Sequence, residues 1–172
     1  MPPLSVTFIP TMLDLIKESW DKPSSSLQIS RCTENHYKTH GPNTNFLTKL
    51  PTPKSIIVES NQSRAWNKSS IAPTNREGRK LDTVGRRLYS LTLVMMRVAN
   101  YQAAMGVYHR QLWNKILPLL EAAPVSVKSE AITIHTEAST LTKQQRIASH
   151  DTADAASKAM ATSVALRRRA WL

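Results

Sequence analysis

A seven-residue apolar repeat between residues 76 and 116 constrains this chain more than any other feature. Apolar side chains recur there at alternating steps of three and four, and no proline interrupts them. This spacing predicts one long amphipathic helix over about residues 75–117, with a seam typical of helices that wrap around each other. The members of the repeat are Leu81, Val84, Leu88, Leu91, Met95, Val98, Met105, Leu112 and Ile116.

A second helix is expected over about residues 126–167. We expect Pro118 to end the first helix, and residues 118–124 form a connection too short for anything but antiparallel neighbours. Alanine dominates after residue 148, so the second helix can approach a partner closely but buries little area of its own. The positions expected to face that partner are Ala131, Ile134, Ala138, Leu141, Ala148, Ala155, Ala159 and Leu166.

Three residues inside the first predicted helix need an explanation. Gly85 and Gly106 each cost the helix about 1 kcal/mol relative to alanine, so they allow either a close approach of another backbone or a bend. We favour close packing. His109 falls on the apolar repeat, where we expect a hydrogen-bonded polar group between helices.

Residues 1–73 are predicted to form an irregular, proline-punctuated arm that precedes a helical self-association domain at 74–172. A short helix is expected at 11–20, and the β-branched run at 55–59 is expected to be extended. The sequence leaves open whether the arm docks on the helices or is fully disordered. Its candidate docking points are Trp20, Phe46, Leu47, Trp66 and the run Ile56–Val58.

The composition favours an all-α fold of long amphipathic helices in an antiparallel hairpin or coiled coil. Four glycines and 6% aromatic residues argue against a glycine-rich β-sandwich or a dinucleotide-binding sheet. A single cysteine suits a reducing compartment. No apolar run is long enough for a bilayer, and the first residues lack the basic start of a signal peptide, so no membrane partner is expected.

The net charge of +11 favours an anionic partner, and it is unevenly spread. Residues 74–117 hold eight Lys and Arg against two acids, which is +6 of the total. These cations could bind nucleic-acid phosphates, or pair with acids of the second helix such as Asp151 and Asp154, which antiparallel folding would bring near. Both interpretations stay open. The proposed anion-binding surface is Arg76, Arg79, Lys80, Arg86 and Arg87.

The sequence shows no catalytic constellation, and we expect neither an enzyme nor a cofactor. Cys32, His36 and His40 would share one face of a helix, as soft-metal ligands do. A structural zinc site needs a fourth ligand, and the neighbouring sequence offers none, so we predict no metal site and a solvated polar loop instead.

Several ordered blocks carry a resemblance to a known family. They are NREGRKLDTVGRRLYS (75–90), RVANYQAAM (97–105) and SVALRRRAWL (163–172), preceded by WDKPSSS (20–26) and FLTKLPTPKSIIVES (46–60). With these blocks the chain resembles the gag-like protein of DIRS-type tyrosine-recombinase retrotransposons. It is similar in the same way to the C-terminal domain of lamina-associated polypeptide 2 alpha. The resemblance covers about residues 19–172.

The resemblance implies an all-α domain that dimerises through a multi-stranded antiparallel coiled coil, in a nuclear or particle-forming scaffold. Lamin-type and other nuclear partners are implied for the lamina-associated relative, but no binding residue can be matched here. Family members generally continue past this ending, and no LEM-type module precedes it, so we expect a fragment of a decayed or domesticated element. Our first hypothesis is a nuclear, homodimeric, non-enzymatic scaffold; the alternative is a basic nucleic-acid-binding coat protein of a retroelement. Without the nuclear implication we would expect a cytoplasmic protein.

Overall fold

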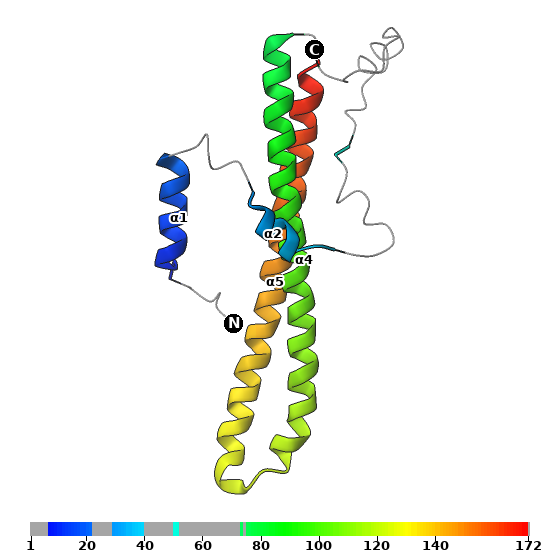
Figure 1. The fold of residues 1–172 in the computed structure, drawn as a ribbon. Coiled ribbons are helices and arrows are strands. Elements are labelled where there is room, and N and C mark those ends of the chain that lie inside the picture. The colour runs from blue at the N-terminus through cyan, green and yellow to red at the C-terminus, as the bar shows by residue number, and fades with distance from the viewer. Residues whose placement is uncertain (1–6, 22–28, 40–49, 52–72, 74, 172) are drawn as a thin grey trace.

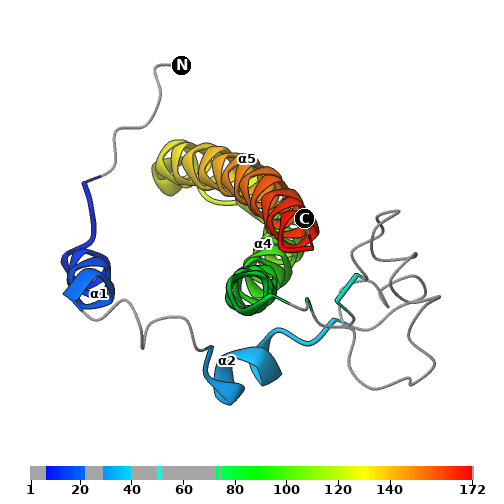
Figure 2. The same ribbon diagram turned by 90° about the horizontal axis from the view of Figure 1, so that it is seen from above.

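The computed structural model describes residues 7–21, 29–39, 50–51, 73 and 75–171. The regular secondary structure of these residues is all helical. It consists of α1 (Pro10–Asp21), α2 (Arg31–His36), α4 (Arg76–Glu121) and α5 (Val125–Arg169). The long helices α4 and α5 lie side by side as an antiparallel hairpin, with the start of α4 beside the end of α5 (Figures 1 and 2). The predicted all-α hairpin is confirmed. Among the described helices none is long and apolar enough to pass through a membrane.

The ends of the hairpin helices follow from local sequence. The Asn75 side chain accepts a hydrogen bond from the backbone N–H of Glu77 at 3.1 Å, which caps the start of α4. Contrary to our expectation, Pro118 does not end α4, which continues to Glu121. Proline there removes a single N–H, and only one turn follows, closed by a bond from Ala122 N–H to Pro118 O.

Small residues spaced seven apart form the contact between α4 and α5. A Cβ atom added at Gly78 would overlap the backbone oxygen of Ala170, and one at Gly85 would lie 2.5 Å from Cγ of Arg167. The predicted close packing at Gly85 and Gly106 is therefore confirmed. We call this contact the small-residue seam. Its buried members are Gly78, Gly85, Thr92, Ala99 and Gly106 on α4, and Thr142, Ser149, Ala156, Ser163 and Ala170 on α5.

The hydroxyl groups in the small-residue seam are satisfied within their own helices. Ser149 and Ser163 donate to the carbonyl oxygens of Arg146 and Met160, at 2.8 and 2.7 Å. Thr92 donates to carbonyls three and four residues earlier, and Thr142 to the carbonyl of Ala138. Hydroxyls can therefore be buried between the helices without leaving an unpaired polar group.

The predicted large-residue seam does not join the two helices. Met95, Met105 and Leu141 are 40%, 42% and 56% exposed, and none of the large residues of the apolar repeat on α4 is buried. The contact lies one residue further along α4, where the small side chains at 85, 92, 99 and 106 let the backbones approach. His109 is exposed as well; the polar ring between the helices belongs to His135, whose Nε2–H donates to Trp113 O at 3.1 Å.

The described parts of the N-terminal region add two short helices. The helix expected at 11–20 is present as α1, which stands apart from the hairpin and exposes its large apolar side chains (Figure 1). Helix α2 lies beside the middle of α4, where the Tyr37 ring meets Tyr101 edge-on with centroids 5.6 Å apart (Figure 2). The expected extended run at 55–59, and the docking points Phe46, Leu47 and Trp66, fall outside the described residues.

Overfilling the small-residue seam should destabilise the hairpin. Ala156 is fully buried in the seam, while Ala161 on the same helix is exposed. We expect Ala156→Leu to lower the free energy of unfolding by about 1–3 kcal/mol, because the close helices have no room for the extra carbons. Ala161→Leu should change it by less than about 0.5 kcal/mol. Urea unfolding followed by helical circular dichroism measures both, and equal midpoints would contradict a tightly packed seam.

Candidate interaction surfaces of the hairpin

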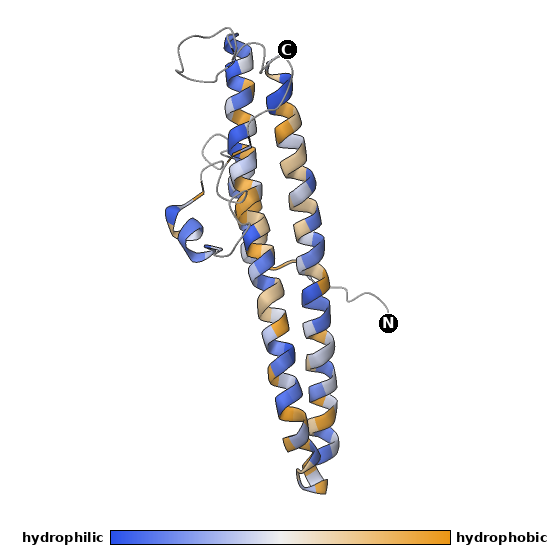
Figure 3. Ribbon diagram, turned by 90° about the vertical axis from the view of Figure 1, so that its right-hand side faces the viewer, coloured by the Kyte–Doolittle hydropathy of each residue, from blue (hydrophilic) through white to orange (hydrophobic). Residues whose placement is uncertain are grey.

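The large apolar residues of the predicted seam form an open surface along the hairpin. They recur on α4 with the same seven-residue period as the small-residue seam but point to a different side, and most are exposed or half-buried. Figure 3 shows apolar positions recurring along α4 between polar ones. We call this surface the apolar face. It comprises Leu81, Val84, Leu88, Leu91, Met95, Val98, Met105, Leu112 and Ile116 of α4, with Ile134 and Leu141 of α5.

Both helices contribute to the same side of the hairpin. Leu91, Val98 and Met105 each directly precede a residue of the small-residue seam on α4, and Leu141 directly precedes Thr142 on α5. In an antiparallel pair, the positions just before the seam on each helix share one flank. The apolar face is therefore two helices wide over part of its length.

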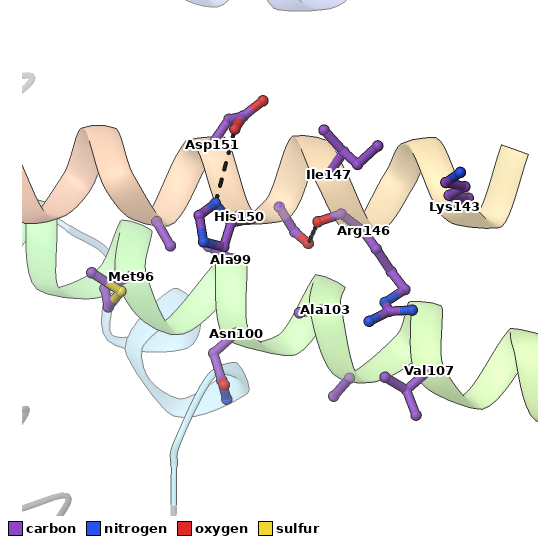
Figure 4. A pocket seen from close by; sticks show the side chains of 13 residues that line it. Met96, Ala99, Asn100, Ala103, Val107, Lys143, Arg146, Ile147, His150 and Asp151 are labelled. Atoms are coloured by element: carbon purple, nitrogen blue, oxygen red, sulfur yellow. Dashed lines mark hydrogen bonds and ion pairs between the residues drawn. The ribbon is translucent and has the colours of Figure 1, made fainter.

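The opposite flank holds a shallow groove between α4 and α5 (Figure 4). Ala103 and Val107 line it from α4, and Ile147 and His150 line it from α5. The Arg146 side chain packs against Gly106, where an added Cβ atom would lie 2.7 Å from its Cγ. The Ser149 hydroxyl in this groove is bonded to the Arg146 carbonyl, so it is not poised as a nucleophile.

A buried ion pair joins the two helices at the open end of the hairpin. Asp82 Oδ1 accepts from Arg167 Nε at 3.0 Å, and its Oδ2 accepts from Arg86 Nε at 2.6 Å. The side chains of Asp82 and Arg167 are 6% and 3% exposed. Arg167 also donates from Nη1 to the backbone oxygen of Pro51 at 2.7 Å, so this pair holds part of the N-terminal region against the hairpin.

The pairing of the basic cluster with Asp151 and Asp154, one of the two interpretations left open by the sequence, is not seen among the described ion pairs. Gly78 packs on Ala170 and Gly85 on Ser163, so residues 76–87 face the last two turns of α5. Asp151 and Asp154 lie two to three turns away; Asp154 instead pairs with Lys158, 2.5 Å away on α5. This hydrogen bond to Asp154 raises the pKa of Lys158.

The predicted basic residues remain on the surface around the ion pair. Arg76, Arg79 and Arg87 are exposed, and Lys80 makes an exposed ion pair with Glu77 at 3.1 Å. An exposed pair of this kind contributes little to stability, and its cation remains available to solvent. The predicted anion-binding residues thus lie within about three turns at the start of α4, and the antiparallel register places Arg168 and Arg169 of α5 at the same end of the hairpin.

The buried ion pair was missed from the sequence. Asp82 and Arg167 are 85 positions apart, and only the register of the hairpin makes them neighbours. Burial raises the pKa of the neighbouring Tyr89, and the Arg167 charge lowers it in part. The signal that was present is a second seven-residue repeat, of small residues, directly after Val84, Leu91, Val98 and Met105.

Of the three residues with side chains that could bind a soft metal, Cys32, His36 and His40, the structure describes only the first two. Cys32 and His36 share one face of α2, with Sγ and Nδ1 3.7 Å apart, and His40 falls outside the described residues. Across the residues that the structure does describe, no three His, Cys, Asp or Glu side chains gather as a metal site would need. Comparisons of the chain with protein-family models, curated proteins and solved structures found no match.

Removing Asp82 should destabilise the hairpin, because it leaves a buried cation without its counter-charge. We expect Asp82→Ala to lower the free energy of unfolding by about 3 kcal/mol, because Arg167 would lose its counter-charge while staying buried. Glu77→Ala, which breaks only the exposed pair with Lys80, should have little effect. The double variant Asp82→Leu/Arg167→Met should recover most of the loss. Denaturant unfolding measures all three, and equal losses for Asp82→Ala and Glu77→Ala would rule out this role.

Proposed function

We propose that this protein is a non-enzymatic self-association module in which two hairpins pair through the apolar face. One observation carries the proposal: α4 and α5 join through small residues and leave a seven-residue repeat of large apolar side chains open to solvent. Contiguous exposed apolar surfaces of this kind mark interaction sites in soluble proteins.

The hairpin buries few large apolar side chains, so burying more apolar surface would stabilise it. Its buried hydrophobic residues within the described chain include three alanines, Ala99, Ala156 and Ala170, beside Tyr89, Leu93 and Val94. Alanine contributes little apolar area, whereas covering a half-exposed Leu or Met adds roughly 1 kcal/mol. Pairing over the apolar face would thus supply burial that the small-residue seam lacks.

A second copy of the chain is the occupant that best matches the face. It offers the same period along about 53 Å of helix, from Leu81 to Ile116 at 1.5 Å per residue. The rims are also complementary: Glu130 and Glu137 border the face on α5, and Lys115 borders it at a similar height on α4. Laying α4 of one copy over α5 of the other would bring these opposite charges together.

The family resemblance agrees with this arrangement. Its first block, 75–90, and its last, 163–172, contain the pairs Gly78–Ala170 and Asp82–Arg167. The two blocks therefore pack on each other across the hairpin. We extend the proposal, on the resemblance, to a nuclear or particle-forming scaffold of the gag-like or lamina-associated kind.

A charge placed on the apolar face should abolish the dimer. We expect the unmodified chain to have twice its chain mass of 19.3 kDa by light scattering, at low and high salt alike. Met95→Asp and Met105→Asp should give monomers, because an unpaired carboxylate would be buried between the copies. Val107→Asp is the matched control: Val107 is 45% exposed, like Met105 at 42%, but lies on the opposite flank, by the groove.

Helical circular dichroism confirms that each variant is folded before its mass is interpreted. A dimer that survives both methionine substitutions but not Val107→Asp would move the interface to the groove side. A monomeric unmodified chain would overturn the proposal and point to another cover for the face, such as α1 of the same chain.

A further inference from the structure

The open end of the hairpin is the most strongly charged surface in the described structure. Its cations come from both helices, which meet there only because the hairpin is antiparallel. All are exposed. We call this surface the basic end, and it comprises Arg76, Arg79, Lys80, Arg86 and Arg87 of α4 with Arg168 and Arg169 of α5.

Local acids do not neutralise this surface. Over residues 75–90 and 160–171 there are eight Lys and Arg, counting buried Arg167, against the two acids Glu77 and Asp82, which leaves +6. Asp82 is buried, where its charge is already matched by Arg167 and Arg86. Helix α5 has no acid after Asp154. The chain thus concentrates more than half of its net charge of +11 at one end.

We propose that the basic end is a docking surface for the phosphate backbone of duplex nucleic acid. Six of its seven cations are arginines, whose planar guanidinium groups bind phosphate oxygens in a two-pronged fashion. Arg76, Arg79 and Lys80 surround a shallow hollow with Thr83 and Val84 at its side. Along α4, Arg79 and Lys80 lie about one helical turn after Arg76, and Arg86 and Arg87 lie almost two turns further on, so the cations extend over about three turns and can contact more than one phosphate.

The chemistry of the basic end favours a double strand over a single strand. Binding of single strands relies on exposed aromatic rings on which bases stack. Tyr89 is buried and Trp171 is half-buried with its indole nitrogen covered, so neither ring is fully exposed for stacking. The contacts would be to the backbone alone, so binding should be independent of sequence and strongly weakened by salt.

This surface is independent of the proposed self-association. Arg79 and Arg86 each lie two residues before Leu81 and Leu88, and at about 100° per residue they point to nearly the opposite side of α4. Pairing through the apolar face would therefore leave these arginines open. Each inference can fail without the other.

The test is the affinity of the full chain for a short duplex DNA, measured by fluorescence anisotropy between about 50 and 200 mM salt. We expect Arg79→Gln/Arg87→Gln to weaken binding about tenfold at low salt and to reduce the slope of log affinity against log salt by about two. The matched control, Arg110→Gln/Lys143→Gln, removes the same charge from exposed positions away from the basic end and should change affinity less than about threefold.

Three results would overturn the proposal. Equal weakening by both double variants would mean that net charge, not this surface, drives binding. Tighter binding of a single strand of the same length would exclude a duplex site. Equal binding of polyglutamate at matched charge would indicate an acidic protein partner instead. Light scattering on Arg79→Gln/Arg87→Gln, expected to match the unmodified chain, separates this test from self-association.

Discussion

The close approach of the α4 and α5 backbones is the constraint on which the rest of the structure depends. It requires residues without bulk at every seventh position of both helices, and Gly78, Gly85 and Ala156 supply them. Because small side chains occupy the seam, the large apolar ones must lie elsewhere, and on α4 they form a separate row. The contact between the two helices and the exposed row of large apolar residues therefore lie on different sides of α4.

The same constraint shapes the electrostatics of the open end. Two helices this close leave little apolar volume to bury, and the pair Asp82–Arg167 fills the last layers of the seam instead. A buried ion pair is costly unless its hydrogen bonds are satisfied, and here Arg86 and the Pro51 carbonyl complete them. The remaining arginines stay in solvent, which is why the surface charge is so uneven.

Much of the fold, and less of the contacts within it, could be predicted from the sequence. Periodicity and the prolines indicated two long helices joined by a short turn, and Gly85 and Gly106 indicated close packing. The contact between α4 and α5 was missed because a search for apolar periodicity gives weight to Leu, Met and Val, whereas this seam consists of Gly, Ser, Thr and Ala. The members of the basic cluster were predicted, but the ion partner Arg167 was not, since the pairing depends on a register that no local pattern specifies. Pro118 was misjudged because proline is tolerated when a single helical turn follows it.

The regular spacing of the small residues affects how firmly the alignment of α5 along α4 is determined. If α5 shifted by seven residues along α4, Gly85 would meet Ala156 or Ala170 in place of Ser163, and small side chains would again lie against small ones. The small-residue seam alone therefore distinguishes poorly between alignments of α5 on α4 that differ by seven residues. The unlike contacts break this degeneracy: Asp82 with Arg167 at one end, and the Trp113 ring edge-on to His135 near the turn. The short turn at 122–124 adds a third restraint, so the alignment of a hairpin more than forty residues long is determined chiefly at its two ends.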